Sequence, residues 1–135
     1  MDEGASIIKL MNAAGYDVAT PGNHEFDYGM ARALATVQEA KFPYVSCNFY
    51  HEKNGVVGDP VLDSYKVFDM NGTKVAFVGI TTPESFTKSP PAYFQDANGK
   101  YIYGIAAGKD GVIHRNLSRQ RAVEHEDSSE KGEGI

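Results

Sequence analysis

Apolar side chains in the first third of the chain follow a helical spacing and then an extended one. Gly4–Ala14 carries its apolar residues three and four positions apart, which predicts an amphipathic helix. We predict a short strand over Tyr16–Thr20, a second helix over Met30–Ala40, and a buried strand over Tyr44–Phe49. A strand, a helix and a strand in succession predict parallel pairing with a right-handed crossover.

The second half of the chain carries the pattern of antiparallel strands. Asn71-Gly72 separates two apolar runs, Val61–Met70 and Lys74–Ile80, and predicts a hairpin whose type I′ turn needs a positive φ at both positions. The second run is almost continuously apolar, so we expect that strand to be covered on both faces. Ser85–Tyr103 is rich in Pro, Asn and Gly and is expected to be a loop, with a short edge strand over Tyr101–Tyr103. The predicted class is α/β.

Composition narrows the function classes. A chain of 135 residues fits one domain, and its net charge of −5 argues against affinity for a nucleic acid polymer. The sequence has no apolar run of membrane-spanning length. Its one cysteine, Cys47, excludes an internal disulfide and lies in an apolar run, where we expect a small buried hydrophobe.

The composition changes near residue 108. Every Phe and Tyr lies between Tyr16 and Tyr103, whereas residues 109–135 combine mixed charges with few apolar side chains. We therefore expect a folded part over 1–108 and a divergent, flexible tail over 109–135. His114 and His125 lie in this tail and are expected to be surface histidines.

One loop gathers side chains that are able to bind metals or transfer protons. Pro21–Gly29 follows a predicted strand and contains Asn23, His24, Glu25 and Asp27. An Asn carbonyl is a neutral ligand for divalent cations, and a His titrates near neutrality. Glu25 and Asp27 are expected to bond amides of the loop or of the following helix.

Other interpretations of this loop stay open. Pro, Gly, Asn and Asp are common in ordinary loops between a strand and a helix. Gly22–Gly29 also suits a phosphate or a single metal ion held at backbone amides. Ligands in open α/β sheets do bind at loops that leave the carboxyl ends of strands.

The motif resembles a known signature. Gly22-Asn23-His24-Glu25 is similar to the signature of the calcineurin-like metallophosphoesterases, and Thr20–Gly29 resembles their bacterial 5'-nucleotidase / 2',3'-cyclic-nucleotide 2'-phosphodiesterase branch. Two further blocks, Phe42–Asn48 and Val78–Glu84, follow in the family's order. The resemblance covers Asp2 to Gly108 and implies part of an α-β-β-α sandwich.

The resemblance also implies roles for two residues. Asn23 would bind one ion of a two-metal centre, and His24 would lie beside the phosphate and stabilise or protonate the leaving oxygen. Mn²⁺, Zn²⁺, Co²⁺ and Mg²⁺ all suit such a centre. The substrate would be a nucleotide or another phosphate ester. Export to the periplasm, the cell wall or the medium is expected.

Several blocks of the family pattern are absent from the sequence. The Asp-x-His and Gly-Asp blocks do not precede the motif, and no Gly-His-x-His block follows it. We therefore expect an internal fragment of a catalytic domain, inactive alone and holding one ion or none. The alternative is a non-catalytic α/β module that binds a partner or associates with itself through exposed sheet edges.

Two further polar residues have simpler interpretations. Asn48 ends a predicted strand, and a turn-capping role is preferred over a role in the site. His51 lies in the polar run His51–Gly55 and is expected to be a solvated surface residue in a loop.

Overall fold

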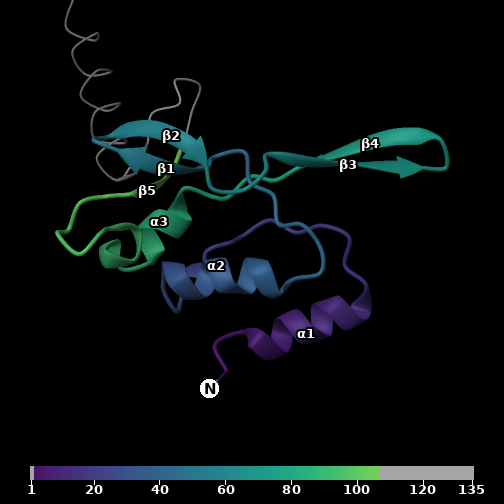
Figure 1. The fold of residues 1–135 in the computed structure, drawn as a ribbon, viewed down its shortest axis with the longest axis horizontal. Helices are drawn as coiled ribbons and strands as arrows, with labels where there is room; N and C mark the ends of the chain where they lie inside the picture. The colour runs from purple at the N-terminus through teal and green to yellow at the C-terminus, as the bar shows by residue number, and fades with distance from the viewer. Residues whose placement is uncertain (1, 107–135) are drawn as a thin grey trace, which may run out of the picture.

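Two helices run along one side of the molecule, and two small antiparallel sheets lie on the other side (Figure 1). The computed structural model describes residues 2–106, so the predictions for the tail, His114 and His125 lie outside the described residues. The helical elements are α1 (Ala5–Ala14), α2 (Met30–Glu39), α3 (Glu84–Lys88), and two 3₁₀ turns, η1 (His24–Phe26) and η2 (Pro91–Phe94). The strands are β1 (Phe49–Lys53), β2 (Val56–Pro60), β3 (Tyr65–Met70), β4 (Thr73–Val78) and β5 (Tyr103–Ile105).

The two long helices form where the apolar spacing predicts them. Helix α1 ends at Gly15, whose left-handed backbone (φ 78°) lets its N–H bond the carbonyl of Asn12 at 3.3 Å. Arg32 of α2 donates to both carboxylate oxygens of Glu39, at 2.9 and 2.8 Å, and to the carbonyl oxygen of Glu3 at 3.1 Å. The Arg32 hydrogen bonds lower the pKa of Glu39, and the guanidinium ties the start of α1 to α2.

The predicted strands before and after α2 meet in parallel but only briefly. Ala19 and Tyr44 form a single parallel bridge, and the Val45 N–H donates to the Ala19 carbonyl at 2.8 Å. The parallel pairing is confirmed, whereas full strands over Tyr16–Thr20 and Tyr44–Phe49 are wrong. The chain turns at Cys47 and begins the antiparallel strand β1 at Phe49, which shortens the parallel ladder.

Gly79 allows a close backbone crossing at this ladder. Its carbonyl accepts from the Cys47 N–H at 2.8 Å, and its own N–H donates to the Ser64 carbonyl at 3.3 Å. A Cβ atom at Gly79 would overlap the carbonyl oxygen of Val45 and press on the Thr20 hydroxyl. The crossing therefore requires a residue without a side chain.

Two hairpins carry the same turn dipeptide. In β3–β4, Asn71 and Gly72 have φ values of 53° and 87°, which confirms the predicted turn. In β1–β2, Asn54 and Gly55 have φ values of 54° and 79°, so the expected polar loop after Phe49 is instead a strand and a hairpin turn.

His51 keeps its expected exposure although it lies in β1 rather than in a loop. Its ring lies 5.0 Å from that of Tyr103. Strand β5 pairs antiparallel with β1, so the predicted edge strand forms slightly later than Tyr101–Tyr103.

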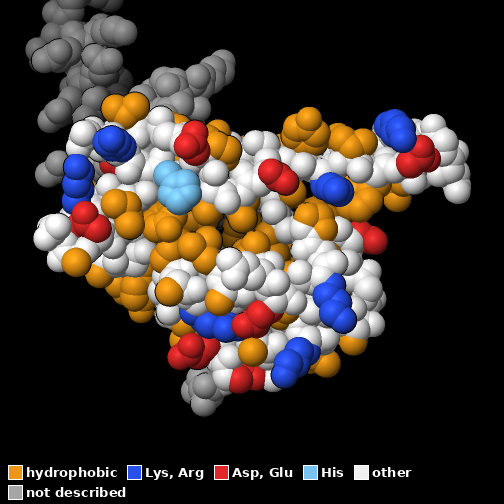
Figure 2. All heavy atoms as spheres, in the orientation of Figure 1, with side chains coloured by type: hydrophobic (Ala, Val, Ile, Leu, Met, Phe, Trp, Pro, Cys, Tyr) orange, Lys and Arg blue, Asp and Glu red, His pale blue; other side chains and the backbone are white. Residues whose placement is uncertain are grey.

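The β3–β4 hairpin is more exposed than its apolar sequence predicts. The exposed fractions of Phe77, Val78 and Ile80 are 42%, 60% and 65%, so the expectation of a strand covered on both faces is wrong for the described residues. The hairpin is a two-stranded sheet, and within residues 2–106 neither a further strand nor a helix packs on it to bury both faces. Figure 2 shows apolar side chains at the surface along the β3–β4 hairpin.

The main core is aromatic, and it includes side chains from Ser85–Tyr103, a segment that we expected to be a loop. Helix α3 and the turn η2 place Phe86 and Phe94 inside, with ring centroids 4.5 Å apart. These residues pack with Phe26, Phe49 and Ile105. The loop prediction over Ser85–Tyr103 is therefore wrong, because its aromatic side chains bury themselves through two short helical turns. A smaller cluster joins α1 to the parallel ladder through Ile8, Phe42 and Tyr44.

Replacing Gly79 by Ala is expected to destabilise the chain by roughly 1–3 kcal/mol or more, because the new methyl group meets backbone rather than a movable side chain. Ala76→Val adds apolar volume at an exposed position of the same hairpin and should change stability little. Urea unfolding followed by circular dichroism measures both variants. Equal unfolding midpoints for Gly79→Ala and the unaltered chain would contradict the close crossing.

Candidate phosphoesterase site segment

The motif loop is held by its own side chains. Phe26 is 1% exposed and lies in the aromatic core, 5.6 Å from the ring of Phe49 and 5.4 Å from that of Phe94. The Glu25 carboxylate accepts from the Gly22 N–H at 2.7 Å, which confirms the predicted bond to a loop amide. This bond also occupies one of the amides that a phosphate held by the loop backbone would need.

Asn23 keeps its side-chain amide available. It precedes η1, and its carbonyl accepts from the Phe26 N–H at 3.2 Å. The side chain is half-buried and makes no hydrogen bond within residues 2–106. The amide oxygen is thus a candidate ligand on a backbone that the buried Phe26 holds in place.

His24 and Asp27 form a pair on one turn. The imidazole Nδ1 lies 2.7 Å from Oδ2 of Asp27, and the two side chains are 84% and 49% exposed. With Nδ1 engaged, Nε2 is the ring nitrogen left for another partner. The prediction that Asp27 bonds an amide is corrected by this contact. The spacing of three residues was the available signal, since such residues are neighbours on a helical turn.

A shallow hollow of about 210 Å³ opens beside His24, between α1 and α2. Arg32 lines it, but that guanidinium is already paired with Glu39. Tyr44 lies at the same hollow, and burial, followed by the nearby Glu25 carboxylate, raises the pKa of its hydroxyl. The hollow therefore offers little unpaired positive charge to an anion.

Asn48 serves the fold, but by joining segments distant in sequence rather than by the expected capping of a turn. Its amide nitrogen donates to the carbonyls of Thr81 and Ala106 at 2.7 and 3.0 Å, and its amide oxygen accepts from the Thr81 N–H at 2.9 Å. Ser46 joins this network through the Thr81 hydroxyl at 2.8 Å. These bonds commit the Asn48 side chain to joining two chain segments. Cys47 nearby is a free thiol that is half-buried, less than we expected.

Known proteins match parts of this chain. A 5'-nucleotidase of Vibrio vulnificus is 34% identical over 85 residues, which is 63% of this chain and 15% of that protein. A snake venom 5'-nucleotidase of Gloydius brevicauda is 34% identical over 93 residues, 66% of this chain and 16% of that protein. No family model matches the chain.

Solved structures agree with these relatives. A 5'-nucleotidase precursor from Thermus thermophilus aligns with a TM-score of 0.53 and 28% identity over 63% of this chain and 17% of that chain. The calcineurin-like phosphoesterase YfkN of Bacillus subtilis aligns with a TM-score of 0.59 and 24% identity over 90% of this chain and 37% of that chain.

This chain is related to the 5'-nucleotidases and has part of a calcineurin-like phosphoesterase fold. The resemblance and the fold class inferred from the motifs are thereby confirmed. The chain spans about 15% of the length of the curated relatives that it matches.

Within the phosphoesterase fold, the described residues alone do not fit a two-metal centre. Residues 2–106 contain no group of three or more His, Cys, Asp or Glu side chains placed to hold an ion. Asn23 is a neutral ligand and contributes no charge against two dications. Residues 2–106 of this chain thus offer one candidate metal ligand, Asn23, and the pair formed by His24 and Asp27.

The contact with Asp27 should fix the tautomer of His24. Neutral His24 is expected to carry its proton on Nδ1, and Asp27→Ala should shift it toward Nε2, because the acceptor at Nδ1 is lost. Asp27→Asn keeps an oxygen acceptor and should retain the Nδ1–H form. ¹⁵N NMR of the two ring nitrogens measures this, with His51 as the internal control. An unchanged His24 spectrum in Asp27→Ala would show that the pair does not form in solution.

Proposed function

We propose that this chain supplies the Asn-His segment of a metal-dependent phosphoesterase that hydrolyses nucleotide phosphate esters. The observation that carries the proposal is the position of Asn23 beside the His24–Asp27 pair, on a loop that Phe26 anchors in the core. Relatives named 5'-nucleotidases support the substrate class.

The pair suggests how His24 acts in this reaction. Asp27 accepts at Nδ1 and so directs the opposite nitrogen, Nε2, toward a bound phosphate. As an imidazolium, His24 donates a hydrogen bond or a proton through Nε2 to the leaving oxygen, and the Asp27 carboxylate faces the charged ring until the proton is transferred. The exposure of His24 leaves that nitrogen accessible to an ester in solvent.

Asn23 would contribute one neutral oxygen to a divalent ion, and the remaining ligands would come from outside the described residues. A pair of such ions would neutralise the phosphate and lower the pKa of a bound water. With a single candidate ligand among residues 2–106, the chain is expected to show no turnover on its own.

We also propose that the protein acts outside the cytoplasm. One relative is named a snake venom 5'-nucleotidase, and a venom protein is secreted, which supports this location. No helix within residues 2–106 is both long enough and apolar enough to span a bilayer.

A chimera tests the proposed activity. The matched segment of this chain replaces the corresponding segment of the Vibrio vulnificus 5'-nucleotidase, and release of phosphate from a nucleoside 5'-monophosphate is measured with Mn²⁺, Zn²⁺, Co²⁺ or Mg²⁺. We expect metal-dependent turnover, because the chimera restores the missing ligands. His24→Ala should lower kcat by about 10²-fold or more, since general acid catalysis contributes that much.

His51→Ala is the matched control for the chimera, because His51 lies exposed in β1 away from the motif loop. Asn23→Ala should raise the metal concentration that is needed for half-maximal rate. A folded chimera whose turnover survives both motif substitutions would refute the roles proposed for Asn23 and His24.

Self-association is a second candidate, favoured by the exposed apolar side chains of the β3–β4 hairpin. Tyr65, Val67 and Val78 are exposed on the hairpin, and its two strands pair only with each other among the described residues. Unpaired strand edges and exposed apolar surface favour pairing with a second copy.

Light scattering after size exclusion tests this second candidate. We expect the 135-residue chain to form dimers or larger species, and Val67→Lys to shift it toward the monomer, because a buried ammonium disfavours the contact. Thr73→Lys adds the same charge at the hairpin tip and should leave the species unchanged. A monodisperse monomer at all concentrations would rule self-association out.

A further inference from the structure

Two turns of this chain repeat the same dipeptide in nearly the same geometry. Asn54-Gly55 joins β1 to β2, and Asn71-Gly72 joins β3 to β4. The two asparagines have φ values of 54° and 53°, and both glycines have positive φ, at 79° and 87°. All four residues are exposed. The two turns therefore differ in their contacts rather than in φ or in exposure.

An Asn-Gly pair carries its own electrophile and nucleophile. The glycine backbone nitrogen attacks the asparagine side-chain carbon, a C–N bond forms, the nitrogen's proton passes to a solvent base, and ammonia leaves. Water then opens the cyclic imide at either carbonyl and yields aspartate or isoaspartate. Glycine favours the attack because it has no Cβ to shield the nitrogen. The glycine N–H must first lose its proton.

The Gly72 nitrogen is held by a carboxylate. Its N–H donates to Oδ1 of Asp69 at 2.7 Å, and the other oxygen of Asp69 accepts from the Lys74 ammonium at 2.8 Å. The hydrogen bond from Lys74, followed by that from Gly72, lowers the pKa of Asp69, which is ionised at neutral pH. Removing the Gly72 proton beside this negative charge is unfavourable, because like charges repel.

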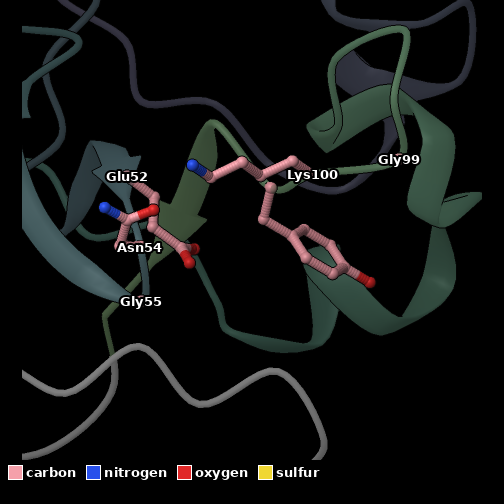
Figure 3. Close-up of a pocket in the computed structure, with 6 residues that line it drawn as sticks. Glu52, Asn54, Gly55, Gly99 and Lys100 are labelled. Carbon is pink, nitrogen blue, oxygen red and sulfur yellow. The ribbon is translucent and has the colours of Figure 1, made fainter.

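The Gly55 nitrogen has no such contact. Within residues 2–106, its N–H makes no hydrogen bond. Figure 3 shows Asn54 at the edge of an open hollow that the side chains of Glu52 and Lys100 also line, with a volume of about 240 Å³. Water therefore reaches the turn from this side. The third described pair, Asn98-Gly99, resembles the protected turn, since the Gly99 N–H donates to the Asp96 carbonyl at 3.0 Å.

We propose that Asn54 is a site of spontaneous deamidation, and that Asp69 protects Asn71 from the same reaction. Conversion of Asn54 places a new carboxylate beside Glu52. Isoaspartate also adds a methylene to the main chain of a two-residue loop, which disturbs the register of Lys53 opposite Val56. The chain thus contains a deamidation site in the turn that follows β1, the strand that pairs with β5.

The test is incubation of the full, folded chain in mildly alkaline buffer, followed by peptide mapping with mass spectrometry and isoaspartate assay. We expect Asn54 to convert several-fold faster than Asn71 and Asn98. Asp69→Ala should raise the rate at Asn71 toward that at Asn54. Asp69→Asn keeps an oxygen acceptor for Gly72 but removes the negative charge, so it should retain only part of the protection. Asp59→Ala removes an exposed carboxylate from β2 and should change neither rate.

Incubating the same chain in concentrated urea separates the effect of the Asp69 contact on the deamidation rates from the effect of the local sequence. Without the fold, Asp69 no longer holds Gly72, and the ratio of the two rates should fall toward one. This comparison needs no variant, so it stands even where Asp69→Ala weakens the hairpin. Faster conversion of Asn71 than of Asn54 in the folded chain would overturn the proposal. An unchanged rate at Asn71 in folded Asp69→Ala would overturn the protective role, and a slower rate would overturn it and show that the carboxylate acts as a base.

Discussion

The insertion of Phe26 into the aromatic core is the contact on which the motif loop depends. Phe26 lies between two potential catalytic side chains in sequence, yet it is buried against Phe49 and Phe94. A loop that buries one large ring has less conformational freedom in its backbone, so the side chains next to that ring keep defined positions. The polar chemistry of Asn23 and His24 thus rests on an apolar anchor between them and Asp27.

Two short-range contacts within the motif loop add to the anchoring by Phe26. The bond from Gly22 to Glu25 and the contact between His24 and Asp27 both span three residues, the reach of one helical turn. One bond fixes the backbone before the turn, and the other fixes the imidazole. Both contacts lie within the loop, whereas the burial of Phe26 ties the loop to the rest of the domain. The described residues contain no group of three or more His, Cys, Asp or Glu side chains that could hold a metal ion.

The sequence predicted those elements that depend mainly on residues close together in the chain. The spacing of apolar residues located α1 and α2, and Asn71-Gly72 located one hairpin, because both signals depend on neighbouring residues alone. The same dipeptide at Asn54-Gly55 was missed because the residues before it, His51–Lys53, are polar or charged and lack the apolar alternation of a strand. Phe86 and Phe94 were assigned to a loop because their helical turns are too short to show a period.

Burial and tertiary pairing were harder to predict. The apolar run ending at Ile80 suggested a covered strand, but coverage depends on which other segments pack there, and this cannot be read from the run itself. The candidate site was located through its motif, whereas the contact between His24 and Asp27 was not predicted although their spacing of three residues permits it.

The crossing at Gly79 has a consequence for redesign. Cys47 and Ser64 reach it through main-chain atoms, so most side chains around the crossing can be exchanged without altering how the segments cross. A scheme that grafts the motif loop into another scaffold would thus have to transplant a spacing between backbones, with glycine at position 79, as well as the core that buries Phe26.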